Sequence, residues 1–109
     1  MIYELRVYEI APGKMAIQNK RFAEGACPLF EKHGMTIVGF WETLVGENNN
    51  ELTYILGYKD LADRERAWRE LNADPEHHKL VEERQRDPEP MVRRIRNCLL
   101  RPTSYSPLR

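Results

Sequence analysis

The chain has 109 residues, of which 41% are hydrophobic and 31% are charged. This is the composition of one globular domain over residues 1–109, since a chain of this length buries roughly 65% of its unfolded surface and folds without metals or disulfides. Seventeen basic residues balance seventeen acidic ones, so no overall electric field attracts nucleic acid or an anionic membrane.

The two cysteines, Cys27 and Cys98, form no metal-spaced pattern. The amino terminus lacks the basic and apolar segments of an export signal, and nowhere do eighteen apolar residues run together. No glycine-rich phosphate loop or Ser-His-Asp set is present. We therefore expect a reduced, cytoplasmic protein with no metal or cofactor, and with neither nucleic acid nor membrane as a partner.

The chain opens with an alternating segment, Ile2–Ile10, which predicts a strand. Pro12–Gly13 ends this strand, and apolar residues at steps of three and four then predict a helix over residues 15–33. A kink or break is expected over Gly25–Pro28, because proline lacks an amide donor and clashes with the preceding turn. Gly34 follows in the position of a left-handed cap.

A β-hairpin is predicted next. Met35–Val45 and Leu52–Tyr58 are rich in aromatic and β-branched residues, which favour strands. The linker Gly46–Asn50 is dominated by glycine and asparagine, which tolerate the backbone conformations of tight turns. Strict alternation places Ile37 and Trp41 on one face of the first strand and Phe40 on the other.

Two helical pieces and a last strand complete the chain. Asp60 predicts the cap of a helix over residues 61–71, and Asp74-Pro75-Glu76 predicts the start of another that reaches Gln85. Alternation resumes over Met91–Arg101 and predicts the fourth strand.

The resulting order, β-α-β-β-α-β, predicts an α+β, ferredoxin-like fold with both helical segments on one face of a four-stranded antiparallel sheet. Apolar residues occupy both faces of the strands, as when Leu56 and Ile55 point in opposite directions. A bare apolar face of this size is too large for a monomer, so we expect a second copy to cover it.

Several segments together resemble the NIPSNAP family, within the dimeric α/β-barrel superfamily, over nearly the whole chain. They are Tyr3–Tyr8, Pro12–Lys14, Gly39–Trp41, the Gly46 turn, Leu61–Arg64 and Asp74–Glu76. The resemblance implies a homodimer whose two sheets close into a barrel, and it implies no reaction. One departure stands out, because the family commonly has tryptophan after the Asp-Pro-Glu motif and this chain has His77.

Arg6 and Tyr8 project from the same face of the first strand. An arginine fork beside a phenol can hold a carboxylate or an enolate. The structural alternative is that Arg6 pairs with Glu4 or with an acid across the sheet, while Tyr8 packs with its hydroxyl at an edge.

Four aromatic residues, Trp41, Tyr54, Tyr58 and Trp68, are candidates for the walls of an apolar cleft between the sheet and the helices. Core packing is the alternative interpretation. Buried tyrosine and tryptophan need partners for their polar atoms, so a pocket with a few polar groups is compatible with either role.

His77 and His78 complete the candidate ligand-binding residues. His78 and Glu82 are spaced to act as an acid–base couple or as two metal ligands, but a third ligand at sensible spacing is absent. A solvated helix face is the simpler interpretation of this charged segment.

The last strand carries several arginines close together, which is typical of a patch for an anion or a nucleic acid. They are Arg93, Arg94, Arg96 and Arg101. Acidic residues lie just upstream, at Glu82, Glu83, Asp87 and Glu89, so mutual neutralisation is the preferred interpretation.

Two function classes follow. The first is a homodimeric module that binds a small ligand or a partner, and it is favoured because no activated nucleophile or acid–base pair is evident. The second is a cofactor-independent enzyme, of monooxygenase or isomerase type, acting on an aromatic or enolisable molecule. In that enzyme Arg6 and Tyr8, with His77 or His78, would polarise the substrate.

Overall fold

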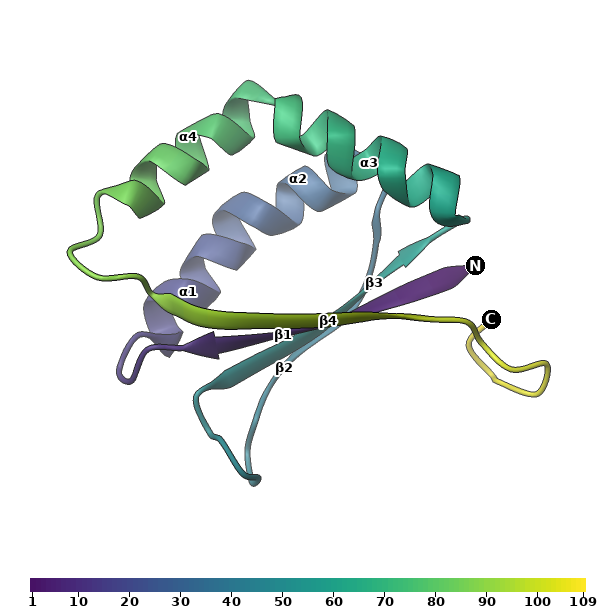
Figure 1. Ribbon diagram of the computed structural model, residues 1–109, viewed down its shortest axis with the longest axis horizontal. Helices are drawn as coiled ribbons and strands as arrows, with labels where there is room; N and C mark the ends of the chain where they lie inside the picture. Colours follow the sequence, from purple (N-terminus) through teal and green to yellow (C-terminus); the bar gives the residue numbers. More distant parts are fainter.

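The computed structural model describes residues 1–109 as a four-stranded antiparallel sheet with its helices on one side (Figure 1). The strands lie in the order β2-β3-β1-β4. The elements are β1 (Ile2–Ile10), α1 (Met15–Arg21), η1 (Phe22–Ala26), α2 (Cys27–Lys32), β2 (Thr36–Glu42), β3 (Glu51–Tyr58), α3 (Leu61–Ala73), α4 (Pro75–Gln85) and β4 (Val92–Leu100). The predicted α+β, ferredoxin-like fold is confirmed.

The predicted break in the first helix is a π-helical segment, η1. At its end the amide of Cys27 donates to the carbonyl of Phe22, five residues earlier. Pro28 then falls in the first turn of α2, where a missing amide donor is tolerated. One wider helical turn therefore accommodates the proline. The segments α1, η1 and α2 follow one another without an intervening loop.

The predicted helix ends agree with the structure. Asp60 accepts a hydrogen bond from the amide of Asp63 at 2.8 Å, and Asp74 accepts one from the amide of Glu76 at 2.9 Å. Gly34 has φ of 79°, the left-handed conformation that glycine adopts without strain. These local rules are enough to fix where α2 ends and where α3 and α4 begin.

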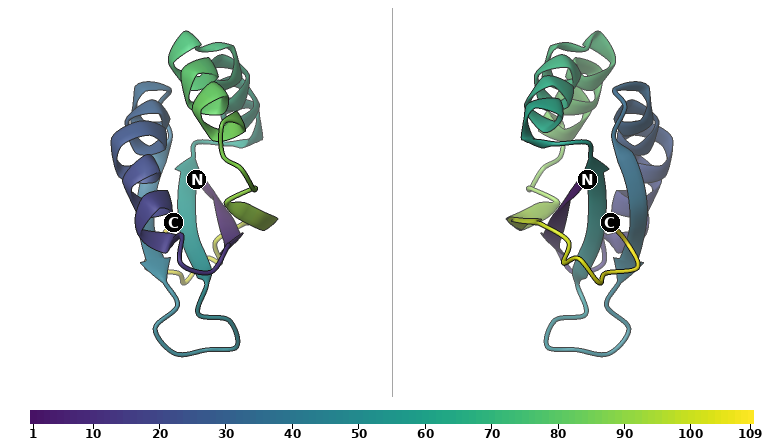
Figure 2. Two further views of the ribbon diagram at one scale, coloured as in Figure 1. Left: turned by 90° about the vertical axis from the view of Figure 1, so that its left-hand side faces the viewer. Right: turned by 90° about the vertical axis from the view of Figure 1, so that its right-hand side faces the viewer.

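The hairpin differs from the prediction in length. The first of its strands, β2, ends at Glu42 and not at Val45, because Glu42 opposite Leu52 is the last pair of the β2–β3 ladder. Leu44 and Val45 lie in the connecting loop with about 90% of their surface exposed. Figure 2 shows this loop reaching away from the rest of the molecule.

A bulge in β2 also overturns the predicted alternation. Ile37 pairs with Leu56 but Gly39 pairs with Ile55, so the register shifts between them. Phe40 consequently lies on the helix-facing side, stacked on Tyr54 at 4.5 Å between ring centroids. Strict alternation fails here because the extra residue of a bulge reverses the faces of all residues beyond it.

The central charge of the fold is the carboxylate of Glu4, which is fully buried on the helix-facing side of β1. It accepts hydrogen bonds from Arg64 of α3 at 3.0 and 3.1 Å, and from Arg6 at 2.9 Å. Tyr58 of β3 donates at 2.7 Å and Asn97 of β4 at 2.8 Å. One carboxylate thus joins three strands and a helix.

We expect Glu4→Gln to lower the free energy of unfolding by about 3 to 5 kcal/mol at pH 7, since it leaves two arginines without their buried counter-charge. Burial alone raises the pKa of Glu4, but hydrogen bonds from Arg64, Tyr58 and Asn97 and the charge of Arg6 outweigh it and lower this pKa to about 2. The stabilisation is therefore complete above the unfolded-state pKa near 4.5 and disappears as the pH falls toward 2.

Urea unfolding at pH 7 and at pH 3 measures both effects. Glu9→Gln, on the same strand, is the control and should change stability by no more than about 0.5 kcal/mol. A Glu4→Gln variant as stable as wild type at pH 7 would show that this carboxylate does not hold the fold together.

Candidate functional site

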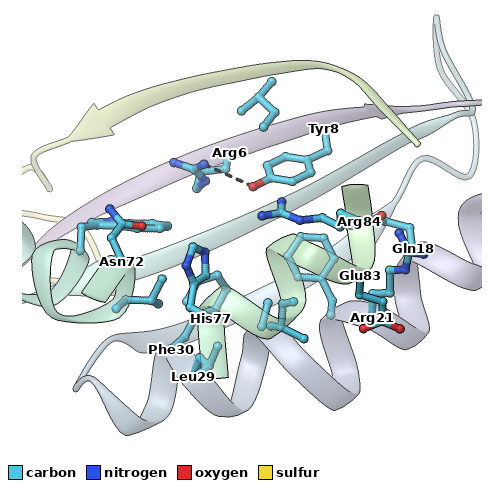
Figure 3. Close-up of a pocket in the computed structure, with 16 residues that line it drawn as sticks. Arg6, Tyr8, Gln18, Arg21, Leu29, Phe30, Asn72, His77, Glu83 and Arg84 are labelled. Atoms are coloured by element: carbon cyan, nitrogen blue, oxygen red, sulfur yellow. Dashed lines mark hydrogen bonds between the residues drawn. The ribbon is translucent and has the colours of Figure 1, made fainter. Parts of the chain in front are cut away.

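A cavity of about 340 Å³ lies between the helix-facing side of the sheet and the helices (Figure 3). Arg6 and Tyr8 of β1 form its polar side, and aromatic and aliphatic side chains form most of the rest. The apolar lining residues include Phe22, Leu29, Phe30, Trp68, Leu71 and Leu80. A mostly apolar pocket with a few convergent polar groups is the usual form of a small-molecule site.

The polar side of the cavity is a short hydrogen-bonded chain. Arg6 donates through Nε to the hydroxyl of Tyr54 at 2.7 Å, and Tyr54 donates in turn to the hydroxyl of Tyr8 at 3.1 Å. Nη2 of Arg6 also donates to the Tyr8 oxygen, at 3.3 Å. Because that oxygen accepts two bonds, the hydroxyl proton of Tyr8 is left to donate to a ligand.

The hydrogen-bonded series Arg6–Tyr54–Tyr8 carries a positive charge, and burial does not remove it. Burial alone lowers the pKa of Arg6, but Tyr54, Tyr8 and Glu4 together raise it above its ordinary value. Burial raises the pKa of Tyr54, which keeps its proton for the bond to Tyr8. Arg6 and Arg64 share the single negative charge of Glu4, so one of these two positive charges has no counter-charge.

The opposite side of the cavity is formed by α4, none of whose residues is buried. This helix rests on η1, where Leu80 lies over Gly25 so closely that an added Cβ would be 2.9 Å from a Leu80 methyl group. Gly25 thereby lets α4 approach and cover the cavity. Figure 3 shows His77 and Arg84 of α4 on the side facing Arg6 and Tyr8.

Nδ1 of His77 is buried and has no hydrogen-bond partner in the protein. Burial, followed by the positive charges of Arg84 and His78, lowers the pKa of His77, so its ring is neutral at pH 7. No ion pair or side-chain hydrogen bond engages the guanidinium of Arg84, and Glu83 is the one acidic residue in the lining. The cavity therefore offers an unpaired imidazole nitrogen and a surplus of positive charge.

The NIPSNAP family model matches residues 3–107. The chain belongs to the NIPSNAP family. A NIPSNAP family protein of unknown function from Agrobacterium tumefaciens is 26% identical, with a TM-score of 0.86, and the match covers 100% of this chain and 94% of that one. A second, also from Agrobacterium tumefaciens, is 27% identical with a TM-score of 0.86, covering 99% and 98%.

An uncharacterised NIPSNAP-like domain protein from Burkholderia xenovorans is 28% identical, with a TM-score of 0.83, and the match covers 97% of this chain and 88% of that chain. The comparison with curated proteins finds no match. The family and its fold are thereby established.

The structure of this NIPSNAP protein brings half of the eight predicted site residues to the cavity. They are Arg6, Tyr8, Trp68 and His77. Tyr54 and Tyr58 are fully buried behind the lining, where Tyr58 accepts from Nε1 of Trp68 at 2.8 Å and donates to Glu4. The predicted pairing of Arg6 with Glu4 is therefore confirmed. Its role in holding a carboxylate or enolate stays a prediction, and its bond to Tyr8 fits that role.

Trp41 and His78 lie away from the cavity. The bulge in β2 turns Trp41 to the other face of the sheet, where it is half exposed and covers Gly39. His78 is exposed on α4, and its Nε2 contacts the backbone oxygen of Asn72 at 2.9 Å. Its neighbour on the helix, His77, points inward because consecutive helical residues lie about 100° apart.

Sequence reasoning missed five polar lining residues, which are Gln18, Arg21, Asn72, Glu83 and Arg84. Gln18 interrupts the apolar stripe of the first helix, three residues after Met15 and four before Phe22. A polar residue in such a stripe is a signal that sequence alone provides. No three histidine, cysteine or acidic side chains lie close enough to hold a metal ion, and no helix has the length and apolar content to cross a bilayer.

Proposed function

We propose that this protein is a homodimeric module that binds a small, electron-rich organic molecule, such as an aromatic carboxylate or enolate, in the cavity under α4. The observation that carries the proposal is the Arg6–Tyr54–Tyr8 chain, which leaves one polarised hydroxyl proton inside an apolar pocket. Positive charge at Arg6 and Arg84 favours a negatively charged or strongly polarised oxygen. The aromatic walls favour a flat apolar group.

The homodimer is supported by the sheet face that carries no helix (Figure 1). Its central residues are apolar and either half-buried or exposed, and they include Leu5, Val7, Trp41, Ile55, Cys98 and Leu100. A contiguous apolar face of this kind is a usual interface between protein chains. Two-fold pairing would bring the same face of both copies together and cover it completely.

Light scattering at micromolar concentration should give the mass of a dimer. Ile55→Asp should yield monomers, aggregates or unfolded chains, because it places a charge at the centre of the apolar face. Leu61→Asp, which adds the same charge to an exposed residue on α3, is the control and should remain a folded dimer. A monomeric wild type, or a dimer unaffected by Ile55→Asp, would contradict the assembly.

Phenylpyruvate, an aromatic and enolisable carboxylate, is a suitable probe, and binding should change the fluorescence of Trp68 in the cavity wall. Tyr8→Phe should lose about 1 to 3 kcal/mol of affinity, the usual cost of an unsatisfied buried partner. Arg6→Lys should also weaken binding, since lysine keeps the charge but loses the planar fork. Tyr105→Phe, in the exposed tail, is the control. Equal affinity in the wild type and the three variants would show that Arg6 and Tyr8 do not bind the ligand.

A second candidate function is cofactor-independent proton transfer, and the specific observation that favours it is the unpartnered, neutral imidazole of His77. A neutral histidine can accept a proton from carbon next to a carbonyl group, while Arg6 and Tyr8 stabilise the enolate oxygen. The proton would then return to a different carbon or to the same one.

Exchange of the phenylpyruvate methylene protons with D₂O, followed by NMR, tests this activity. Its rate should rise with pH through an apparent pKa below the ordinary value of histidine, because the lowered pKa of His77 sets the active form. His77→Gln should abolish the enzyme-dependent exchange, and His78→Gln should leave its rate on the high-pH plateau unchanged. Exchange no faster than in buffer would leave the binding module as the function.

A further inference from the structure

A second cavity, of about 660 Å³ and more open to solvent, adjoins the first. It lies between α1, the end of α4 and the start of β4, and it shares four lining residues with the first cavity. The shared residues are Gln18, Arg21, Arg84 and Ile95. A ligand longer than the first cavity would therefore extend into the second.

The lining of the second cavity is strongly basic. Arg84 and Arg93 make no ion pair and no side-chain hydrogen bond. Arg94 also borders the cavity, but it pairs with Glu9, so its side chain belongs to the face of the sheet without helices. Asp87, the one acidic residue of this lining, is held by both terminal nitrogens of Arg21, at 2.7 and 2.8 Å. Two positive charges thus remain without a counter-charge.

The predicted neutralisation of the β4 arginines by the acids before the strand is therefore wrong. Asp87 turns toward α1 and binds Arg21, while Arg96 binds Glu51 of β3 at 2.6 Å. The acids and the arginines follow each other in sequence, but the turn into β4 points them at different neighbours.

Gln18 stands where the two cavities meet, and it is an independent sign of a ligand. Its side chain is 6% exposed, and its amide oxygen is buried with no hydrogen-bond partner in the protein. Burying an acceptor without a donor costs free energy, so such atoms are rare in folded proteins. An N–H or O–H group of a ligand that spans the two cavities would satisfy this oxygen.

We propose, resting on the function proposed above, that the ligand is an elongated phosphate ester. Its apolar, carbonyl-bearing head occupies the first cavity against Tyr8 and Arg6. An N–H or O–H group next to this head donates to Gln18, and its phosphate lies between Arg84 and Arg93. Two arginine forks at one site suit the doubly charged, three-oxygen phosphate group.

The strand register sets the length of this molecule. Arg6 of β1 pairs with Asn97 of β4, and Arg93 lies four residues before Asn97 on the same strand. At the rise of a β-strand this separation is roughly 13 Å along the sheet. The carbonyl oxygen and the phosphate are therefore joined by a linker of about six to eight atoms, given roughly 13 Å between their protein partners.

Isothermal titration of the whole protein with three probes tests the proposal. N-benzoyl-6-aminohexyl phosphate has the head, the N–H group and the phosphate, N-benzoyl-6-aminohexanol lacks only the phosphate, and inorganic phosphate lacks the rest. The ester should bind about 10- to 100-fold more tightly than the alcohol. Inorganic phosphate should bind more weakly than the ester.

Arg93→Gln should reduce the affinity for the ester toward that for the alcohol and leave the alcohol unaffected. Arg101→Gln removes the same charge outside both cavities and is the control. Gln18→Leu should raise the melting temperature of the unliganded protein, because it removes an unsatisfied buried acceptor, while it weakens both organic probes.

The outcomes separate the two proposals. If the alcohol binds but the phosphate adds no affinity, the elongated phosphate ester is overturned and the function proposed above stands. If ester binding needs Arg93 but is unchanged in Arg6→Lys, Arg93 binds phosphate alone and the connected ligand is wrong. If neither organic probe binds, the elongated ligand is overturned, and the phenylpyruvate titration decides the function proposed above.

Discussion

The arrangement of this domain depends on one buried carboxylate. Glu4 lies on the face of β1 that meets the helices, where a strand of a two-layer protein normally presents aliphatic side chains. Its two oxygens receive donors from β1, β3, β4 and α3, so strand pairing and the docking of α3 are joined through a single charge. A buried ion with all its partners in place tolerates little displacement, because each lost bond leaves a charge without solvation.

The fixed position of Glu4 also determines the geometry of the polar side of the cavity. Since Glu4 fixes one end of the Arg6 guanidinium, the remaining nitrogens are directed at Tyr54 and Tyr8, and the rings of Trp68 and Tyr8 enclose the charge at 5.0 and 5.7 Å. Replacing such a polar row by aliphatic residues would be neutral or favourable for stability in many proteins. Its presence here fits a role at the proposed ligand site better than a contribution to folding alone.

The sequence predicts those features that local chemistry determines. The caps at Asp60 and Asp74, the left-handed Gly34 and the order of elements all follow from residues close to one another in the chain. The position of Trp41 does not follow from nearby residues, because the bulge in β2 arises from pairing with β3 and reverses the faces of the residues beyond it. Likewise, the selection of His77 over His78 for the cavity is decided by how α4 packs on Gly25, and the partner of Asp87 lies on α1, remote in sequence.

The π-helical turn of η1 has a consequence for how this cavity can change in evolution. A π-turn closes over five residues where an α-turn closes over four, so it accommodates one residue more. Loss of a single codon within it would restore a regular helix and rotate everything before it by about 100° relative to α2. Gln18 would then leave the junction of the two cavities, while Phe30 and the rest of α2 kept their packing. A one-residue deletion there would therefore replace the cavity-facing side chains of α1 in one step. It would also displace Phe22 from the core, where this side chain packs on Tyr8, Phe40 and Tyr54.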